Sequence, residues 1–430
     1  MDLLKIFLSG NGRVTTDSRK VQPGDIFFAL KGDNYDGNRF AITALERGAA
    51  LAVTDDPALK GERIMFADNA LCKLQELAGN YRRYTGVPLL AITGSNGKTT
   101  TRELISAVLS RKFRVHSSSG NLNNHIGVPL TILSAPRDTE IMVVEMGANH
   151  TGEIGSLCRI ADPDKGIITN IGRAHLEGFG SFDGVVQAKS ELYAYLGKKG
   201  GTIICNRSNQ ILDMMVEKFG CGASVVDYYH PGDNRWVIKE QGMDPGLVVE
   251  AEISGVPYTI RTHLFGKHNT ENVAAAIATG LLYGVEPGAI VTALEDYLPE
   301  NNRSQIMITE TNRVVCDSYN ANPSSMEEAI NSFREASKGR GTVILGDMLE
   351  LGGYSGDEHR KITAMLDRIP GFDVILVGPQ FASAGNPATH KMFDTVNDLI
   401  SWLTDNPVKD TFVMVKGSRG IGLEKIYPHL

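Results

Sequence analysis

A short run of glycine, lysine and threonine residues has the composition of a phosphate-binding loop. Residues 91–100 read AITGSNGKTT and lie between an apolar run and a helical pattern. In a P-loop, backbone N–H groups and a helix N-terminus surround the phosphate oxygens, a lysine reaches the terminal phosphates, and a hydroxyl binds magnesium. The run therefore predicts a nucleotide site made by Gly94, Ser95, Asn96, Gly97, Lys98, Thr99 and Thr100.

An ordinary corner between a strand and a helix is the alternative. The general pattern G-x-x-x-x-G-K-[ST] has a glycine where this chain has Ile92, so the shorter G-x-x-G-K-T is present. Such a corner explains the two glycines. It does not explain why Lys98 is followed by three threonines at a helix start, because threonine is a poor residue for a helix interior. The pattern favours phosphate binding.

Charged residues follow the next two apolar runs. IMVVEMG carries Glu145 near its end, and NIGRAHLEGFGS places His175 and Glu177 just after the following strand. In open α/β sheets the ligand crevice lies outside the carboxyl ends of the strands, so these side chains should gather beside the loop. They form a candidate magnesium shell. A cap or ion pair for Glu145, and a hydrogen-bonded structural role for His175, stay open.

The elements that position these residues divide into three predicted α/β domains. The 430 residues exceed the ~250–300 at which a single core stops growing. Residues 1–84 form a small α/β unit, and the Gly and Pro of TGVP then mark a linker. Apolar strands alternating with helices over 85–298 predict a mostly parallel sheet, with an antiparallel meander at 236–264 as an edge elaboration. The alternation restarts after PENNRSQ, which predicts a Rossmann-like unit over 299–430.

Composition excludes several partners. A net charge of -7 gives no field that would draw the chain to nucleic acid or an anionic membrane. No apolar stretch approaches the ~20 residues of a membrane span, and the first residues lack a signal peptide, so we expect a cytoplasmic protein. The five cysteines are scattered without zinc spacing, which indicates ordinary buried thiols.

The motifs, taken in chain order, resemble the Mur ligases of peptidoglycan synthesis. The motifs that show this resemblance are TGSNGKTT, GNLNNHIGVPLTIL, EMGANHTGEI, AHLEGFGS, AKSELY, GKHNTENVAAAIA, DSYNANPSSM, GDMLELG and VKGSRG. They span about residues 16 to 422, and the short loop is the family's own form. NLNNHIGVP, GANHTGEI and DSYNANP are most similar to the members that add D-alanyl-D-alanine to UDP-N-acetylmuramoyl-tripeptide. The Asn-Pro-Arg motif of the diaminopimelate-adding relative is not found.

The resemblance implies an ATP-driven amide ligase that forms UDP-N-acetylmuramoyl-pentapeptide through an acyl phosphate. It implies that Thr99 and Glu145 hold one Mg²⁺ and that His175 holds a second, with Lys98 at the phosphates. Lys189, in AKSELY, matches the family lysine that carbon dioxide carbamylates. From the residues alone, a helical lysine is more often a solvated one.

The resemblance also implies the nucleotide contacts. Asn269 and Asn272 match the adenine contacts, although a helix N-cap is an open alternative for Asn269. Arg303 and Asp317 match residues at the phosphates and the ribose. The family commonly has glycine where this chain has Asn302, which puts the local backbone geometry in question. Because these residues lie in a different predicted domain from the loop, the site should be complete only after domain closure.

The two substrates would occupy opposite ends of the site. The resemblance implies that the UDP-sugar end contacts the first domain through Thr16, Asp17, Ser18, Arg19 and Lys31, and the central domain through Asn123 and Asn124. An exposed ion pair is the alternative for Asp17 and Arg19. The carboxylate of the dipeptide needs an anion site, for which Lys416, Ser418 and Arg419 are the candidates. The candidates for the rest of the same pocket are Asn320, Asn322 and Asp347.

Other functions remain open at this point. A sister muramoyl ligase or a folylpolyglutamate synthase would share the ATP module, the latter without the first domain. A nucleotide-driven switch or motor would share the loop but generally lacks the other two domains. The sequence leaves open whether the tripeptide ends in lysine or diaminopimelate, and a monomer is expected.

Overall fold

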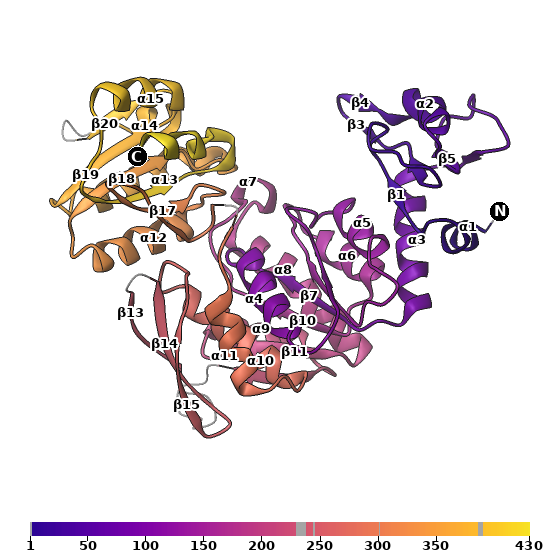
Figure 1. Cartoon of the computed structure of the whole chain (residues 1–430), viewed down its shortest axis with the longest axis horizontal. Coiled ribbons are helices and arrows are strands. Elements are labelled where there is room, and N and C mark those ends of the chain that lie inside the picture. Colours follow the sequence, from indigo (N-terminus) through magenta and orange to yellow (C-terminus); the bar gives the residue numbers. More distant parts are fainter. Residues whose placement is uncertain (1, 229–237, 244–245, 301, 386–389) are drawn as a thin grey trace.

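The computed structural model describes residues 2–228, 238–243, 246–300, 302–385 and 390–430. Three α/β domains follow one another along the chain, and the first and third lie on either side of the central one (Figure 1). The predicted α/β class with three domains is confirmed.

The first domain is built on a four-stranded parallel sheet in the order β1-β2-β5-β6. The last helix of the domain begins after Asn69, whose side chain accepts a hydrogen bond from the Cys72 amide, and ends before the left-handed Gly86. It packs against α5 and α6 of the central domain. The elements are α1 (Leu3–Ser9), β1 (Val14–Thr15), β2 (Ile26–Phe28), β3 (Lys31–Gly32), β4 (Tyr35–Asp36), η1 (Gly37–Phe40), α2 (Ala41–Glu46), β5 (Leu51–Thr54), β6 (Ile64–Phe66) and α3 (Ala70–Thr85).

The central domain is built on a six-stranded sheet in the order β12-β11-β10-β7-β9-β8, parallel throughout. Its strands are β7 (Leu89–Thr93), β8 (Val115–Ser117), β9 (Ile141–Glu145), β10 (Lys165–Ile168), β11 (Thr202–Asn206) and β12 (Ser224–Tyr228). Its helices are α4 (Lys98–Leu109), α5 (Gly127–Leu133), α6 (Glu153–Ala161), α7 (Leu176–Phe179), α8 (Phe182–Lys199), α9 (Gln210–Phe219), α10 (Asn269–Leu282) and α11 (Pro287–Asp296). Because β7 lies between β9 and β10, the carboxyl ends of these three strands are neighbours.

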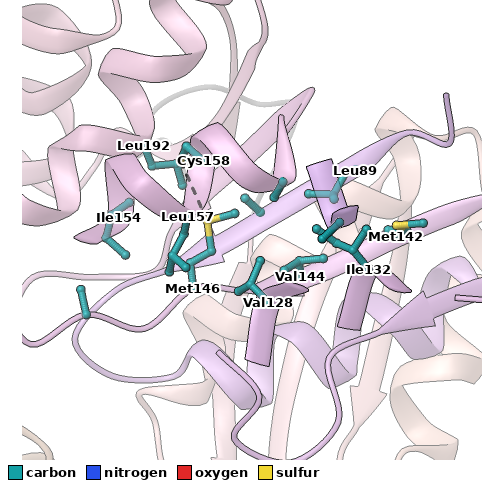
Figure 2. Close-up of a cluster of buried hydrophobic side chains, with 14 of the residues drawn as sticks. Leu89, Val128, Ile132, Met142, Val144, Met146, Ile154, Leu157, Cys158 and Leu192 are labelled. Carbon is teal, nitrogen blue, oxygen red and sulfur yellow. Dashed lines mark hydrogen bonds between the residues drawn. The ribbon is translucent and has the colours of Figure 1, made fainter. Parts of the chain in front are cut away.

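Both faces of the central sheet are buried, which explains why its strands are apolar at successive positions. In β9, Met142 and Val144 join the core beneath α5, α6 and α8, while Ile141 and Val143 join the core beneath α4 and α10. Figure 2 shows the first of these cores, where the Cys158 thiol lies 3.9 Å from the sulfur of Met146. The helices on the two faces thus hold the strand ends rigidly.

The predicted meander at 236–264 forms a sheet of its own. It consists of β13 (Ile238–Met243), β14 (Leu247–Ile253) and β15 (Val256–Arg261), paired antiparallel, and residues 236–237 and 244–245 fall outside the described residues. The predicted antiparallel pairing is confirmed. Its buried side chains pack over α10 and α11, so it adds a layer to the core of the same domain.

The third domain is a six-stranded sheet in the order β16-β17-β21-β18-β19-β20, in which β16 is antiparallel. Its strands are β16 (Gln305–Ile308), β17 (Arg313–Asp317), β18 (Gly341–Gly346), β19 (Phe372–Val377), β20 (Lys391–Phe393) and β21 (Phe412–Lys416). Its helices are α12 (Pro323–Ala336), η2 (Gly352–Tyr354), α13 (Ser355–Leu366), α14 (Pro379–Ala384), α15 (Val396–Asp405), η3 (Arg419–Ile421) and η4 (Leu423–His429). Asn322 and Ser325 form a capping box that fixes the start of α12.

Two composition-based expectations can be compared with the structure. Among the helices that the structure describes, none combines the length and the apolar character that crossing a bilayer requires. All five cysteines are free thiols, but Cys72 and Cys221 are exposed. The expectation of buried thiols therefore holds for the other three.

Candidate active site

A cavity of about 950 Å³ lies where the carboxyl ends of β7 and β9 face the third domain. Of the residues predicted from the sequence, it is lined by Ser95, Asn96, Gly97, Lys98, Thr99, Thr100, Asn123, Asn124, Glu145, His175, Asn269, Asn272, Arg303, Asp317, Asn320, Asn322 and Lys416. The central and third domains therefore build this cavity together, and α3 contributes Leu71 and Gln75 at its other end.

The loop between β7 and α4 requires its two glycines. Gly94 has φ +146°, and a Cβ there would lie 2.0 Å from the hydroxyl oxygen of Thr169. Gly97 has φ +75°, and a Cβ there would lie 2.7 Å from an oxygen of Asn272. The Lys98 ammonium donates to the carbonyls of Gly94 and Ser95, at 2.7 and 3.1 Å. The loop thus closes around its own lysine at the start of a helix.

Residues after β10, which sequence reasoning did not select, hold this loop in place. The Asn96 amide donates to the side-chain oxygen of Asn170 at 2.9 Å, and the Thr169 hydroxyl donates to the Asn96 carbonyl at 2.6 Å. The Ser95 amide donates to the Asn170 carbonyl at 3.0 Å. The sequence could have indicated this role, because the polar Thr169 and Asn170 directly follow an apolar strand. That strand, β10, ends beside β7 and therefore beside the loop.

Glu145 occupies the end of β9 and is almost fully buried. It accepts hydrogen bonds from the Thr99 hydroxyl and the Asn123 side-chain amide, both at 2.9 Å, and Arg102 lies 3.8 Å away. Mg²⁺ prefers oxygen ligands and commonly takes one or two carboxylates together with substrate phosphates. The hydroxyl and carboxylate oxygens therefore fit such an ion. Within the described ranges, no group of three or more His, Cys, Asp and Glu residues is arranged to hold a metal by itself.

His175 faces the third domain. Its backbone is left-handed at φ +53°, and its Nδ1 lies 2.5 Å from a carboxylate oxygen of Glu350. The adjacent His175 ring lowers the pKa of Glu350. Glu177 does not line the cavity, because its side chain turns toward Gly352. A glutamate of another domain thus stands beside His175, and no sequence spacing indicated that pairing.

Lys189 is buried, so the interpretation of a solvated helical lysine is wrong. It is 1% exposed, and its ammonium lies 5.4 Å from the ring centroid of Phe179. Among the described residues, its ammonium has no hydrogen-bond or carboxylate partner. Burial, followed by the charge of Lys98, lowers the pKa of Lys189 to about 7. The helical spacing would have allowed this burial to be predicted, since Lys189 is four residues from the apolar Val185 and from Tyr193, which are both buried.

The adenine candidates lie at the start of α10. The N-cap is His268, so Asn269 is not the cap. Asn269 donates to the Phe265 carbonyl at 2.6 Å, and Asn272 donates to Asn269 at 2.8 Å. His268 also lines the cavity, and burial lowers its pKa to about 4, which keeps the ring neutral near pH 7. Sequence reasoning missed His268, although it lies inside GKHNTEN.

Third-domain residues reach the loop directly. Asn322 donates to the side-chain oxygen of Asn96 at 2.7 Å. The Lys416 ammonium lies 2.5 Å from a carboxylate oxygen of Asp317, and Asp317 also accepts from the Ser304 amide. Asn322 thus contacts the phosphate loop, and the charged pair of Lys416 and Asp317 lines the same cavity.

Asn302, where the resemblance led us to expect glycine, has a left-handed backbone conformation. Its φ is +55°, and Ser304 has φ +48°, so two left-handed residues flank Arg303. Asparagine tolerates this region better than most residues with a side chain. Asn302 can therefore adopt the tight bend that presents Arg303.

Several predicted substrate residues lie outside the cavity. Asp17 and Arg19 form an exposed ion pair at 2.9 Å, as the alternative interpretation held, and Lys31 pairs with Asp55. Asp347 accepts hydrogen bonds from the amides of residues 380 and 381, so it caps α14. The cavity lining does not include Thr16, Asp17, Ser18, Arg19, Lys31, Asp347, Ser418 or Arg419, nor Gly94 and Lys189 beneath it.

Three models of the Mur ligases match consecutive parts of the chain. The Mur ligase family, catalytic domain matches residues 12–87, and the Mur ligase middle domain matches 92–280. The Mur ligase, glutamate ligase domain matches 302–419. The chain belongs to the Mur ligase family.

The similarity extends over nearly the whole length of individual relatives. The UDP-N-acetylmuramoyl-tripeptide–D-alanyl-D-alanine ligase of Bacillus subtilis is 35% identical, over 97% of this chain and 92% of the relative. The structure of MurF from Acinetobacter baumannii has a TM-score of 0.86 at 29% identity, covering 97% of this chain and 92% of that one. MurF ligase from Thermotoga maritima in complex with ADP has a TM-score of 0.87 at 25% identity, covering 100% and 98%.

We predict that position 302 accepts glycine but not a β-branched residue. Asn302→Gly should keep the left-handed bend, whereas Asn302→Val should strain it by about 1–3 kcal/mol and displace Arg303. Calorimetric titration with ADP should show wild-type affinity for the glycine variant and about tenfold weaker binding for the valine variant. Equal affinity in both variants would contradict a role for the bend in presenting Arg303.

Proposed function

We propose that this chain is an ATP-dependent ligase that joins D-alanyl-D-alanine to UDP-N-acetylmuramoyl-tripeptide, forming the pentapeptide precursor of peptidoglycan. The observation that carries the proposal is the cavity in which the phosphate loop, Glu145 and third-domain cations come together. The full-length similarity to ligases with this substrate pair supports the choice of substrates.

The first step must bring a carboxylate against a triphosphate, which is already an anion. A carboxylate oxygen of the tripeptide attacks the γ-phosphorus, the bond to the β–γ bridging oxygen breaks, and ADP leaves. Lys98, Arg303 and the loop amides supply the positive charge that this approach requires. Burial and the neighbouring Arg303 guanidinium lower the pKa of Lys98, while Glu145 opposes the shift. Such charges act strongly because the cavity limits solvent screening.

Magnesium belongs to the same step. Thr99 and Glu145 would hold one ion at the phosphates, and His175 would contact a second near the tripeptide carboxylate. When bound, the metal neutralises phosphate charge and orients the reacting oxygens. The hydrogen bond between Thr99 and Glu145 keeps the two oxygen donors together, and Asn123 holds the other carboxylate oxygen.

In the second step, the amine of D-alanyl-D-alanine attacks the acyl carbon and phosphate leaves. Lys416 and Asn320 line the part of the cavity formed by the third domain, which suits the carboxylate of the dipeptide. Ser418 and Arg419 follow on the same turn after β21, just outside the lining. Asn269 and Asn272 would contact adenine, and Asp317 the ribose.

Lys189 is suited to carbamylation, as the family resemblance implies. A neutral Nζ forms a bond to the carbon of carbon dioxide and loses a proton, which leaves a carbamate anion. Its burial and the lack of a carboxylate partner among the described residues favour the neutral amine. The resulting anion would orient groups at the γ-phosphate, which an ammonium could not do.

Each domain would bind one of the three substrates. We assign residues 1–84 to the UDP-sugar, 85–298 to ATP and 299–430 to the dipeptide. The first-domain candidates, Asp17 among them, would reach the substrate after further domain closure. We also infer a cytoplasmic monomer, since the reaction uses ATP and one chain supplies the whole cavity.

We predict that phosphate release from ATP requires both UDP-N-acetylmuramoyl-tripeptide and D-alanyl-D-alanine, because the tripeptide carboxylate accepts the γ-phosphoryl group and the dipeptide amine then displaces it as phosphate. A phosphate-release assay would compare the complete mixture with mixtures that lack either substrate. Lys98→Ala should remove turnover and serves as the background control. Equal ATP turnover without either substrate would contradict the ligase assignment.

Lys189→Ala should lower turnover by about 10²-fold or more, and small carboxylates such as formate should restore part of it. Lys198→Ala, on the exposed side of the same helix, is the matched control and should be neutral. Because the pKa of Lys189 is about 7, the ammonium predominates below that pH. Wild-type activation by added bicarbonate should therefore rise with pH through about 7. A fully active Lys189→Ala variant would exclude this role.

A further inference from the structure

We propose that Tyr319 is a positioning residue that holds Arg303 and Arg419 ready for their anions, an inference that rests on the ligase function proposed above. Tyr319 lies two residues after the end of β17 and lines the cavity. The guanidinium carbon of Arg303 is 3.6 Å from the centroid of its ring, and that of Arg419 is 5.3 Å away. One aromatic ring thus contacts an arginine of the nucleotide site and an arginine beside the dipeptide site.

The ring is well suited to orient Arg303 without cancelling its charge. A cation is attracted to the face of an aromatic ring, while the N–H groups of the guanidinium plane stay available to an anion. A carboxylate partner would occupy those N–H groups and neutralise them. Within the described ranges, neither Arg303 nor Arg419 has a carboxylate partner, and the Nε of Arg303 is buried without a hydrogen bond.

The main chain of Tyr319 supports the same arrangement. Its amide lies 3.3 Å from the Asn302 carbonyl and donates to it, so Tyr319 tethers the strained bend at Arg303. The Ser304 amide donates to Asp317, and the Ser304 carbonyl accepts from the Phe265 amide at 2.8 Å. The bend is therefore fixed at Asn302 and at Ser304, and the Tyr319 ring fixes the Arg303 side chain between them.

Two unneutralised arginines beside one ring repel each other unless anions separate their charges. The nucleotide phosphates would take Arg303 and the dipeptide carboxylate would take Arg419. Because both cations depend on the same ring, loss of the ring should loosen both sites together. Loss of either arginine should affect one site.

The experiment compares Tyr319→Leu, Tyr319→Phe, Arg303→Lys and Arg419→Lys. Calorimetry measures ADP binding in the absence of the other substrates, and steady-state kinetics measures kcat and the KM for D-alanyl-D-alanine. Tyr319→Leu should weaken ADP binding and raise the dipeptide KM by about 5- to 20-fold each. Tyr319→Phe should match wild type, because the face of the ring and not the hydroxyl makes the contact. Arg303→Lys should affect the nucleotide, and Arg419→Lys the dipeptide.

The controls separate this role from a structural one. Tyr84→Leu changes a tyrosine that is 64% exposed on α3 and should alter neither quantity. Thermal melting shows whether each variant is folded, and Tyr319→Met replaces Tyr319→Leu if the latter is not. Normal ADP binding and normal dipeptide KM in the truncated variant would overturn the proposal, as would a Phe variant as impaired as the Leu variant. If the wild-type enzyme binds ADP but does not turn over D-alanyl-D-alanine, the proposed function would be overturned instead.

Discussion

Electrostatic repulsion between two anions is the constraint on which the rest of this structure depends. A carboxylate approaches a triphosphate only where fixed cations surround both, and cations placed together in a confined cavity repel one another. The chain restrains each in a different way. Lys98 donates to carbonyls of its own loop, Lys416 pairs with Asp317, and Arg303 stacks on Tyr319. Each cation is therefore held in position before its anion arrives.

The sheets determine where these groups can be. Parallel strands buried on both faces end in loops at one edge, and the order of β9, β7 and β10 makes three such loops neighbours. Two contacts connect the third domain to that edge. Asn322 of the third domain donates to the side chain of Asn96, and Arg173 of the central domain forms an ion pair of 2.7 Å with Glu327. The cavity therefore depends on contact between domains, and no single domain provides it alone.

Much of this arrangement could be predicted from the sequence, because it depends on local patterns. The alternation of apolar strands and helices indicated the three α/β domains, and Gly94 to Thr99 indicated the loop. Contacts between distant residues could not be predicted in this way. Glu350 rather than Glu177 stands beside His175, and Asp347 caps a helix, because both outcomes depend on how the third domain folds and packs. Lys189 is intermediate: it was expected to be solvated, although its helical spacing from Val185 and Tyr193 would have allowed its burial to be predicted.

The account's central claim is that the cation cluster at the edge of the central sheet receives the triphosphate. A crystal structure with Mg²⁺ and a non-hydrolysable ATP analogue tests it most directly. We expect the β- and γ-phosphates against the amides of residues 94–99, with Lys98 and Arg303 in contact with phosphate oxygens. A nucleotide bound elsewhere, with this loop empty, would contradict the account.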